Sequence, residues 1–261
     1  MTPVPLLSIV FMGISLVASF AVPAVIAVFL YKKYRCDIPP FFIGCAVMLI
    51  FAFILEQIAH GVIRGLFPGL TDHRVLFALY AGLMAGLFEE TGRFTAFKTV
   101  MKRFAGNDRN ALMYGAGHGG FEAVVILGIT MVNNLIFSVM INTGSASLIP
   151  TDALNAEQLA SLEASLSALS QSQSYVFLLG IAERIAAIVI HMSFSVIVWN
   201  GVKYRKPAYV FLAVALHALV DAGTVLLSGS GMHTVLLEAV ILLAAAVIAL
   251  IAVRLTGHQR R

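Results

Sequence analysis

The chain has 261 residues, of which 60% are hydrophobic and only 11% are charged. Soluble domains carry roughly 25% charged residues, so this composition excludes a soluble globular protein and predicts an all-α, polytopic membrane protein. The net charge of +4 comes from short basic clusters between apolar stretches. Such clusters set the orientation of a membrane protein. We therefore expect the lipid bilayer as a partner and no nucleic acid.

Seven apolar stretches are long enough to cross the hydrocarbon core, which requires about 20 residues of helix. They lie at 5–30, 38–60, 75–97, 111–141, 175–200, 207–228 and 232–254. We predict a bundle of seven transmembrane helices that forms a single integral membrane domain, 1–261, with its catalytic core at 75–228. The first stretch lacks a preceding basic region and a following cleavage site, so it is expected to remain as a span.

The basic residues of the loops predict the orientation. With the N-terminus outside, the inner segments contain Lys32, Lys33, Arg35, Lys98, Lys102, Arg103, Arg109, Lys203, Arg205, Lys206, Arg254, Arg260 and Arg261. The outer segments contain only Arg64 and Arg74. Because basic loops stay on the cytoplasmic side, we predict a multi-pass protein of the cell (inner) membrane with a cytoplasmic C-terminus.

The long connection at 142–174 is rich in Ser and Ala and contains no Lys or Arg, as expected for an outer loop. A helix N-cap is predicted at Asn155-x-x-Gln158. Leucines then recur at helical spacing, at Leu159, Leu162, Leu166 and Leu169. This pattern predicts a short amphipathic helix that lies on the outer membrane surface or covers the bundle.

Ionisable residues lie inside the predicted spans, where each charge costs about 2.5–3.5 kcal/mol at the bilayer centre. We single out Glu89, Glu90, Arg93, His118, Glu122, Glu183, Arg184, His191, His217 and Asp221. At about 1.5 Å per residue, the carboxylate pair and the three histidines reach one level in the inner half of the bilayer. A second tier, formed by Glu122, Glu183, Arg184 and Asp221, lies about one turn further in. We therefore predict that these side chains face one another inside the bundle.

Neighbouring Glu89 and Glu90 cannot both point to one place, because adjacent residues on a helix are about 100° apart. One of them is expected to be reactive and the other structural, paired with Arg93. Instead of forming this ion pair, the Arg93 side chain could extend toward the inner membrane surface, which is the alternative interpretation. Arg184 is expected to form a buried ion pair with Glu122 or Glu183.

Two further groups receive structural interpretations. Gly115, Gly117, Gly119 and Gly120 surround His118, and we favour close helix packing over a water-filled cavity as their role. Glu56, His60 and Arg64 lie at the outer end of the second span. They are interpreted as solvated interface residues without a role in chemistry.

A carboxylate among imidazoles suits hydrolysis of an unactivated amide, which needs a base for water and donors for the oxyanion. We favour Glu89 or Glu90 as the base with His118 orienting the water, His191 and His217 as oxyanion donors, and no required cofactor. Alternatively, His118, His191 and His217, supported by Glu122 and Asp221, ligate Zn²⁺.

Two other classes of function remain open from the residues alone. Buried Glu, His and Asp side chains also mark the ion paths of proton- or cation-coupled transporters. A catalytically silent scaffold that binds membrane helices is the third interpretation. Neither GxSxG nor HExxH occurs, so the sequence lacks the usual markers of serine proteases and zincins.

Four motifs carry a family resemblance: Glu89-Glu90-Thr91-Gly92-Arg93, Gly117-His118-Gly119-Gly120-Phe121-Glu122, Glu183-Arg184 followed by His191, and His217-Ala218-Leu219-Val220-Asp221. They resemble the motifs of the YhfC family of intramembrane proteases, which is related to the CAAX protease and bacteriocin-processing group and to the PrsW proteases. The resemblance covers roughly 80–225. It implies a bacterial, glutamic-type intramembrane endopeptidase that cleaves membrane proteins or peptides and opens toward the inner leaflet.

Overall fold

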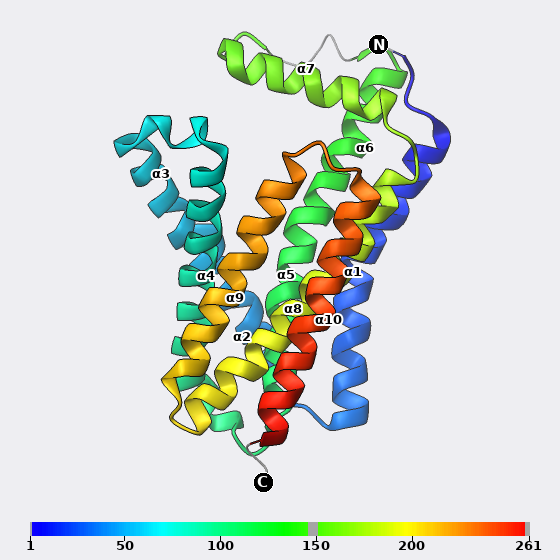
Figure 1. The fold of residues 1–261 in the computed structure, drawn as a ribbon. Helices are drawn as coiled ribbons and strands as arrows, with labels where there is room; N and C mark the ends of the chain where they lie inside the picture. The colour runs from blue at the N-terminus through cyan, green and yellow to red at the C-terminus, as the bar shows by residue number, and fades with distance from the viewer. Residues whose placement is uncertain (1, 146–150, 259–261) are drawn as a thin grey trace.

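A computed structural model describes residues 2–145 and 151–258, and this part of the chain is an all-α bundle (Figure 1). Seven helical segments are long and apolar enough to cross a membrane. They are α1 (Leu6–Tyr34), α2–η1–α3 (Pro39–Leu66), α4 (Arg74–Lys98), α5–η4–α6 (Asn110–Asn142), α8 (Val176–Lys203), α9 (Pro207–Ser228) and α10 (Thr234–His258). The predicted fold class and the number of spans are confirmed.

Two of the spans contain a π-helical segment. The second span consists of α2 (Pro39–Met48), η1 (Leu49–Glu56) and α3 (Gln57–Leu66), and the fourth of α5 (Asn110–Ala123), η4 (Val124–Gly128) and α6 (Ile129–Asn142). Short 3₁₀ turns, η2 (Pro68–Asp72) and η3 (Val100–Phe104), lie on either side of α4. A π turn changes the direction of the side chains that follow it and is frequent near functional sites.

The predicted amphipathic helix is α7 (Ala156–Gln171), which lies across the end of the bundle where the chain begins (Figure 1). The Asn155 side chain accepts from the Gln158 backbone N–H at 2.9 Å, and the Gln158 side chain accepts from the Asn155 N–H at 3.0 Å. Leu166 and Leu169 are buried in a cluster that includes Val4 at the chain start. α7 therefore covers part of the bundle end.

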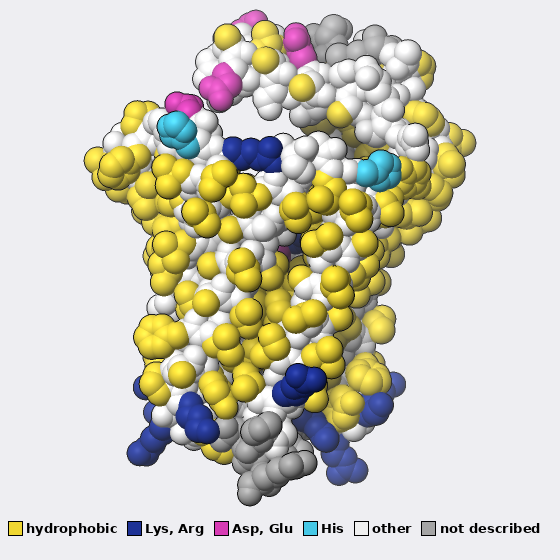
Figure 2. All heavy atoms as spheres, viewed as in Figure 1, with side chains coloured by type: hydrophobic (Ala, Val, Ile, Leu, Met, Phe, Trp, Pro, Cys, Tyr) yellow, Lys and Arg dark blue, Asp and Glu magenta, His cyan; other side chains and the backbone are white. Residues whose placement is uncertain are grey.

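Charged side chains are distributed unequally along the bundle axis. Figure 2 shows Lys and Arg side chains around the end opposite α7, a yellow hydrophobic belt in the middle, and acidic side chains on α7. This distribution supports the predicted orientation, which itself stays a prediction. Two of the basic residues used for it, Arg260 and Arg261, lie outside the described residues.

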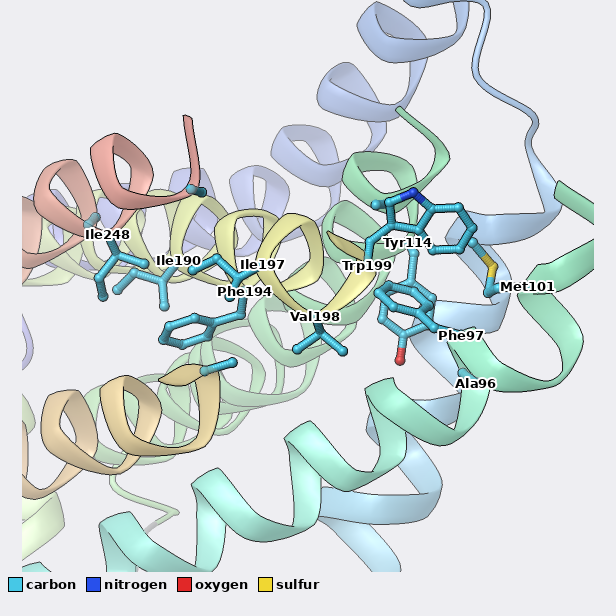
Figure 3. Packing of buried hydrophobic residues seen from close by; sticks show 14 of the residues in the cluster. Ala96, Phe97, Met101, Tyr114, Ile190, Phe194, Ile197, Val198, Trp199 and Ile248 are labelled. Atoms are coloured by element: carbon cyan, nitrogen blue, oxygen red, sulfur yellow. The ribbon is translucent and has the colours of Figure 1, made fainter. Parts of the chain in front are cut away.

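The centre of the bundle is α8, whose most apolar window is 67% buried, compared with 17–39% for the other spans. Near the basic end, aromatic side chains from three helices pack together (Figure 3). The Phe97 ring centroid lies 4.8 Å from that of Tyr114 and 5.4 Å from that of Trp199. This cluster joins α4, α5 and α8 below the level of the histidines, so it fixes the relative positions of three helices that carry site residues.

Glycines allow α5 to pass between α2 and α8 with its backbone in contact with both. A Cβ on Gly117 would lie 1.9 Å from the Phe41 carbonyl oxygen in α2, and one on Gly115 would lie 2.5 Å from the Met192 Cα in α8. Such distances leave no space for a side chain. Close packing is therefore the role of these glycines, and it places His118 between two neighbouring helices.

Candidate active site

Four helices bring a carboxylate and three imidazoles together in the interior. Glu89 comes from α4, His118 from α5, His191 from α8 and His217 from α9, and their exposed fractions are 6%, 0%, 4% and 3%. Each residue is surrounded by apolar spans, so burial in lipid-like surroundings requires polar partners. The structure thus joins the residues that the sequence places at one level, and we call this group the chamber.

Glu89 is the carboxylate at the centre of the chamber. Its Oε2 atom lies 2.9 Å from His118 Nε2 and 3.8 Å from His191 Nδ1, while its Oε1 atom lies 3.8 Å from His217 Nε2. The ring centroids of His118 and His191 are 4.9 Å apart, and those of His191 and His217 are 5.4 Å apart. One carboxylate therefore contacts or faces all three imidazoles.

Glu90 has a structural arrangement, as expected for one member of the pair. Its Oε1 atom accepts a hydrogen bond from Arg93 Nη1, and both side chains are fully buried. The same oxygen lies 2.8 Å from His217 Nδ1. Arg93 also lies 3.2 Å from His191 Nδ1 through its Nη2 atom. Arg93 thus forms the buried ion pair and does not extend toward the inner surface.

The second tier centres on Arg184. Its Nη1 atom donates to Glu122 Oε1 at 2.6 Å and its Nη2 atom donates to Glu183 Oε1 at 2.5 Å, so it pairs with both predicted acids. The other Glu122 oxygen lies 2.7 Å from His191 Nε2. Glu122 therefore bonds to His191 on α8. His118, which lies four residues before Glu122 on the same face of α5, is not its partner. Asp221, four residues after His217 on α9, places Oδ2 3.5 Å from His217 Nε2.

A cavity of about 100 Å³ connects the chamber with the second tier. Its walls include Glu89, Glu122, Glu183, Arg184, His191, His217, Asp221, Thr224 and Ile241. The side chains of Glu183 and Asp221 are 33% and 37% exposed, whereas that of Glu89 is 8% exposed. Glu183 and Asp221, the exposed part of the wall, lie on the side of the chamber nearer α7. This position differs from the opening toward the inner leaflet that the resemblance implied.

Three residues of the chamber could hold a metal ion. Ligand atoms of Glu89, His118 and His191 all lie within 4.8 Å of one another. Two imidazoles and one carboxylate form a donor set that catalytic zinc sites use. The predicted alternative of His118, His191 and His217 shares two of these residues; His217 presents Nε2 to the chamber, 3.8 Å from Glu89 Oε1, and its Nδ1 lies 2.8 Å from Glu90 Oε1. The Glu122 carboxylate on His191 Nε2 matches the outer partner that ligating histidines usually have.

Two buried acids within the spans were missed or misinterpreted from the sequence. Glu56 is only 6% exposed, and its partner His60 contacts it at 3.2 Å and the Tyr80 hydroxyl at 2.6 Å. The interpretation of Glu56 as a solvated residue is therefore wrong. Glu238 on α10 is 7% exposed and was not singled out. It lies within the stretch 232–254, so the rule that charges in spans need an explanation could have found it.

Comparisons with known proteins agree with this architecture. A family model described as YhfC intramembrane metalloprotease matches residues 18–242. The "uncharacterized membrane protein YhfC" of Bacillus subtilis (strain 168) is 31% identical over 243 residues, which cover 92% of this chain and 93% of the relative. No solved structure matches the chain. The family description supports an intramembrane protease and does not support the preference for chemistry without a cofactor. The chain belongs to the YhfC intramembrane metalloprotease family.

Proposed function

We propose that this protein hydrolyses peptide bonds of membrane proteins or membrane-bound peptides inside the bilayer, with a metal ion held by Glu89, His118 and His191. The observation that carries this proposal is the convergence of these three donors within 4.8 Å in a buried chamber. Polarisation of a carbonyl and activation of water are the chemistry that such an ion supplies when bound. Zinc is the metal that the donor set favours.

His217 is our candidate for proton transfer. Its Nδ1 atom lies 2.8 Å from a Glu90 oxygen that also accepts from Arg93. When Nδ1 carries the ring proton and donates a hydrogen bond to this carboxylate, Nε2 is left unprotonated. Nε2 is then a hydrogen-bond acceptor, and it faces Glu89 and Asp221. In this position His217 can take a proton from the attacking water and return it to the departing amine. Glu89 then changes from the base favoured by the sequence to a ligand.

Glu122 and Arg93 position His191. The Glu122 carboxylate accepts a hydrogen bond from Nε2, so Nδ1 is the nitrogen that presents its lone pair to the chamber. Arg93 Nη2 lies 3.2 Å from the same Nδ1. If His191 holds the ion, Nδ1 would be its ligand atom; Arg93 would then give up this hydrogen bond and keep its ion pair with Glu90.

A glutamic mechanism without a metal ion uses the same contacts in another way. The hydrogen bond of 2.9 Å between His118 Nε2 and Glu89 Oε2 would then orient Glu89 as the general base. The two mechanisms differ in one observable property, which is the effect of a chelator. Cleavage that stops on chelation and returns with added Zn²⁺ supports the metal-dependent version, and cleavage that resists chelation supports the glutamic version.

The test uses the purified full chain in lipid nanodiscs with a fluorogenic transmembrane peptide. We expect cleavage by the wild type, with about one bound metal per chain by elemental analysis, and at least a 100-fold loss of rate in Glu89→Gln and His118→Ala, roughly the contribution of a positioned catalytic group. Glu163→Gln, on the exposed face of α7, is the matched control and should cleave like the wild type. Full activity in both chamber variants would overturn the proposal.

A further inference from the structure

A groove of about 500 Å³ runs between α8 and α10 in the half of the bundle nearer the basic end. Figure 1 shows these two helices side by side, and they pack against one another. The small side chains of Ala249 and Ala252 on α10 leave space between them, and the opposite wall comes from Leu112, Val189, Met192 and Val196. None of the four chamber residues lines this groove. It is therefore a separate feature that the proposed chemistry does not use.

The groove has a polar end and an apolar end. Asn200 and Thr256 line it near the ends of α8 and α10, where Asn200 Nδ2 donates to Thr256 Oγ1 at 3.0 Å. This hydrogen bond joins the two walls, and the Asn200 side chain belongs to a residue that is only 5% exposed. Further in, the Ser193 hydroxyl donates to the Val189 carbonyl at 2.7 Å, so it needs no other partner. The groove thus matches a molecule with a polar head and a hydrocarbon tail.

The size of the groove limits what can occupy it. From Val189 to Asn200 it follows α8 for about 16 Å at 1.5 Å per residue, which is close to one leaflet, or half of a hydrocarbon core of about 30 Å. Spread over that length, a volume of about 500 Å³ corresponds to a width of about 6 Å. A helix with its side chains is about 10–12 Å across. The groove therefore accepts one extended hydrocarbon chain and is too narrow for a helix.

Arg109 supplies a positive charge at the polar end. Its guanidinium lies 4.5 Å from the centroid of the Tyr34 ring, and it forms no ion pair within the described part of the chain. A guanidinium stacked on a ring keeps its N–H groups free at the edge, where two of them can bind a phosphate. Asp108, the one acid among the described residues that line the groove, already accepts from Lys203 at 2.6 Å and from Trp199 at 3.0 Å. The polar end therefore has excess positive charge.

We propose that this groove binds one phospholipid of net negative charge from the leaflet at the basic end. Its acyl chain lies between α8 and α10, and its phosphate is bound by Arg109. Three separate observations support this occupant: the groove has the length of one leaflet, it has the width of one chain, and its polar end has a cation without a carboxylate partner. The inference does not depend on the proposed function, because the groove lies outside the chamber.

Native mass spectrometry of the purified full chain tests the charge requirement. The protein is titrated in detergent micelles with phosphatidylglycerol or with phosphatidylcholine, and the bound lipids are counted. We expect one tight site for phosphatidylglycerol per chain. Arg109→Gln should weaken this site about fivefold, the contribution of one Lys or Arg near an anionic lipid, and should leave phosphatidylcholine unaffected. Arg103→Gln is the matched control, because Arg103 is also exposed at this end but does not line the groove.

A second pair of variants tests the position of the acyl chain. Ala249→Phe places a ring in the groove and should weaken the tight site at least about tenfold, because the ring takes the space of the chain. Ala246→Phe places the same ring on an exposed position of α10 and should bind like the wild type. Unchanged phosphatidylglycerol affinity in either Arg109→Gln or Ala249→Phe would overturn the proposal. A wild-type dimer without bound lipid that Ala249→Phe converts to a monomer would assign the groove to a second copy of the chain and would also overturn it.

Discussion

Replacing Glu90 by Gln should unfold the protein far more readily than the same change at Glu89. Glu90 and Arg93 are both fully buried and form an ion pair. In Glu90→Gln the Arg93 guanidinium loses its ion-pair partner, and its hydrogen-bond partners among the described residues are then a neutral amide and His191 Nδ1, at 3.2 Å. Breaking a buried pair in this way costs about 3–5 kcal/mol. In Glu89→Gln the amide oxygen can still accept from His118, so the expected loss of stability is at most about 1 kcal/mol.

Thermal unfolding in nanodiscs, followed by the fluorescence of the single tryptophan, Trp199, measures this difference. At about 2–4 °C per kcal/mol for a chain of this size, Glu90→Gln should lower the Tm by roughly 6–20 °C. A chelator is present throughout so that metal binding does not contribute. The double variant Glu90→Gln/Arg93→Met removes the unpaired charge and should recover most of the loss. A Tm of Glu90→Gln equal to that of the wild type, or a double variant no more stable than the single one, would refute the reasoning.

Three further predictions follow from the packing and the charges. Gly117→Ala should destabilise the bundle by about 3 kcal/mol or more through overpacking. Gly13→Ala is the control, because a Cβ at that position meets open space. Thermal unfolding of both variants measures the difference. Asn155→Ala should cost about 1 kcal/mol of α7 stability and speed hydrogen exchange in α7 alone. In a cysteine-free background, an impermeant maleimide should label Glu163→Cys in intact cells but Lys206→Cys only after lysis, and the reverse pattern would invert the orientation.

The seven spans and the chamber could be predicted because lipid imposes simple rules. A span needs sufficient apolar length, and an ionisable residue within it needs a polar partner. These rules identify Glu89, His118, His191 and His217 as one group before any contact is known. The ends of the helices were harder to predict. α1 continues to Tyr34, beyond the predicted 5–30, because a helix can extend past the hydrocarbon core into the interface with Lys32 and Lys33 in its last turn.

Partner choice within the site could not be read from spacing. An i, i+4 relation places His118 and Glu122 on one face of α5, but it does not determine which side chain on another helix is nearer. Glu122 instead hydrogen-bonds His191, because the glycines of α5 bring α8 into backbone contact. Similarly, the adjacent glutamates were expected to divide their roles, yet only the packing of α9 identifies Glu90 as the partner of His217.

The π-helical segments η1 and η4 determine where the chain can gain or lose a residue during evolution. A π turn contains one residue more than an α turn, so loss of one residue from Val124–Gly128 can be absorbed by a return to α-helical geometry. Elsewhere in a span, the same loss would rotate every following side chain by about 100°. Length changes of a single residue between relatives should therefore be concentrated in these two segments, with the histidines and glutamates on either side keeping their places.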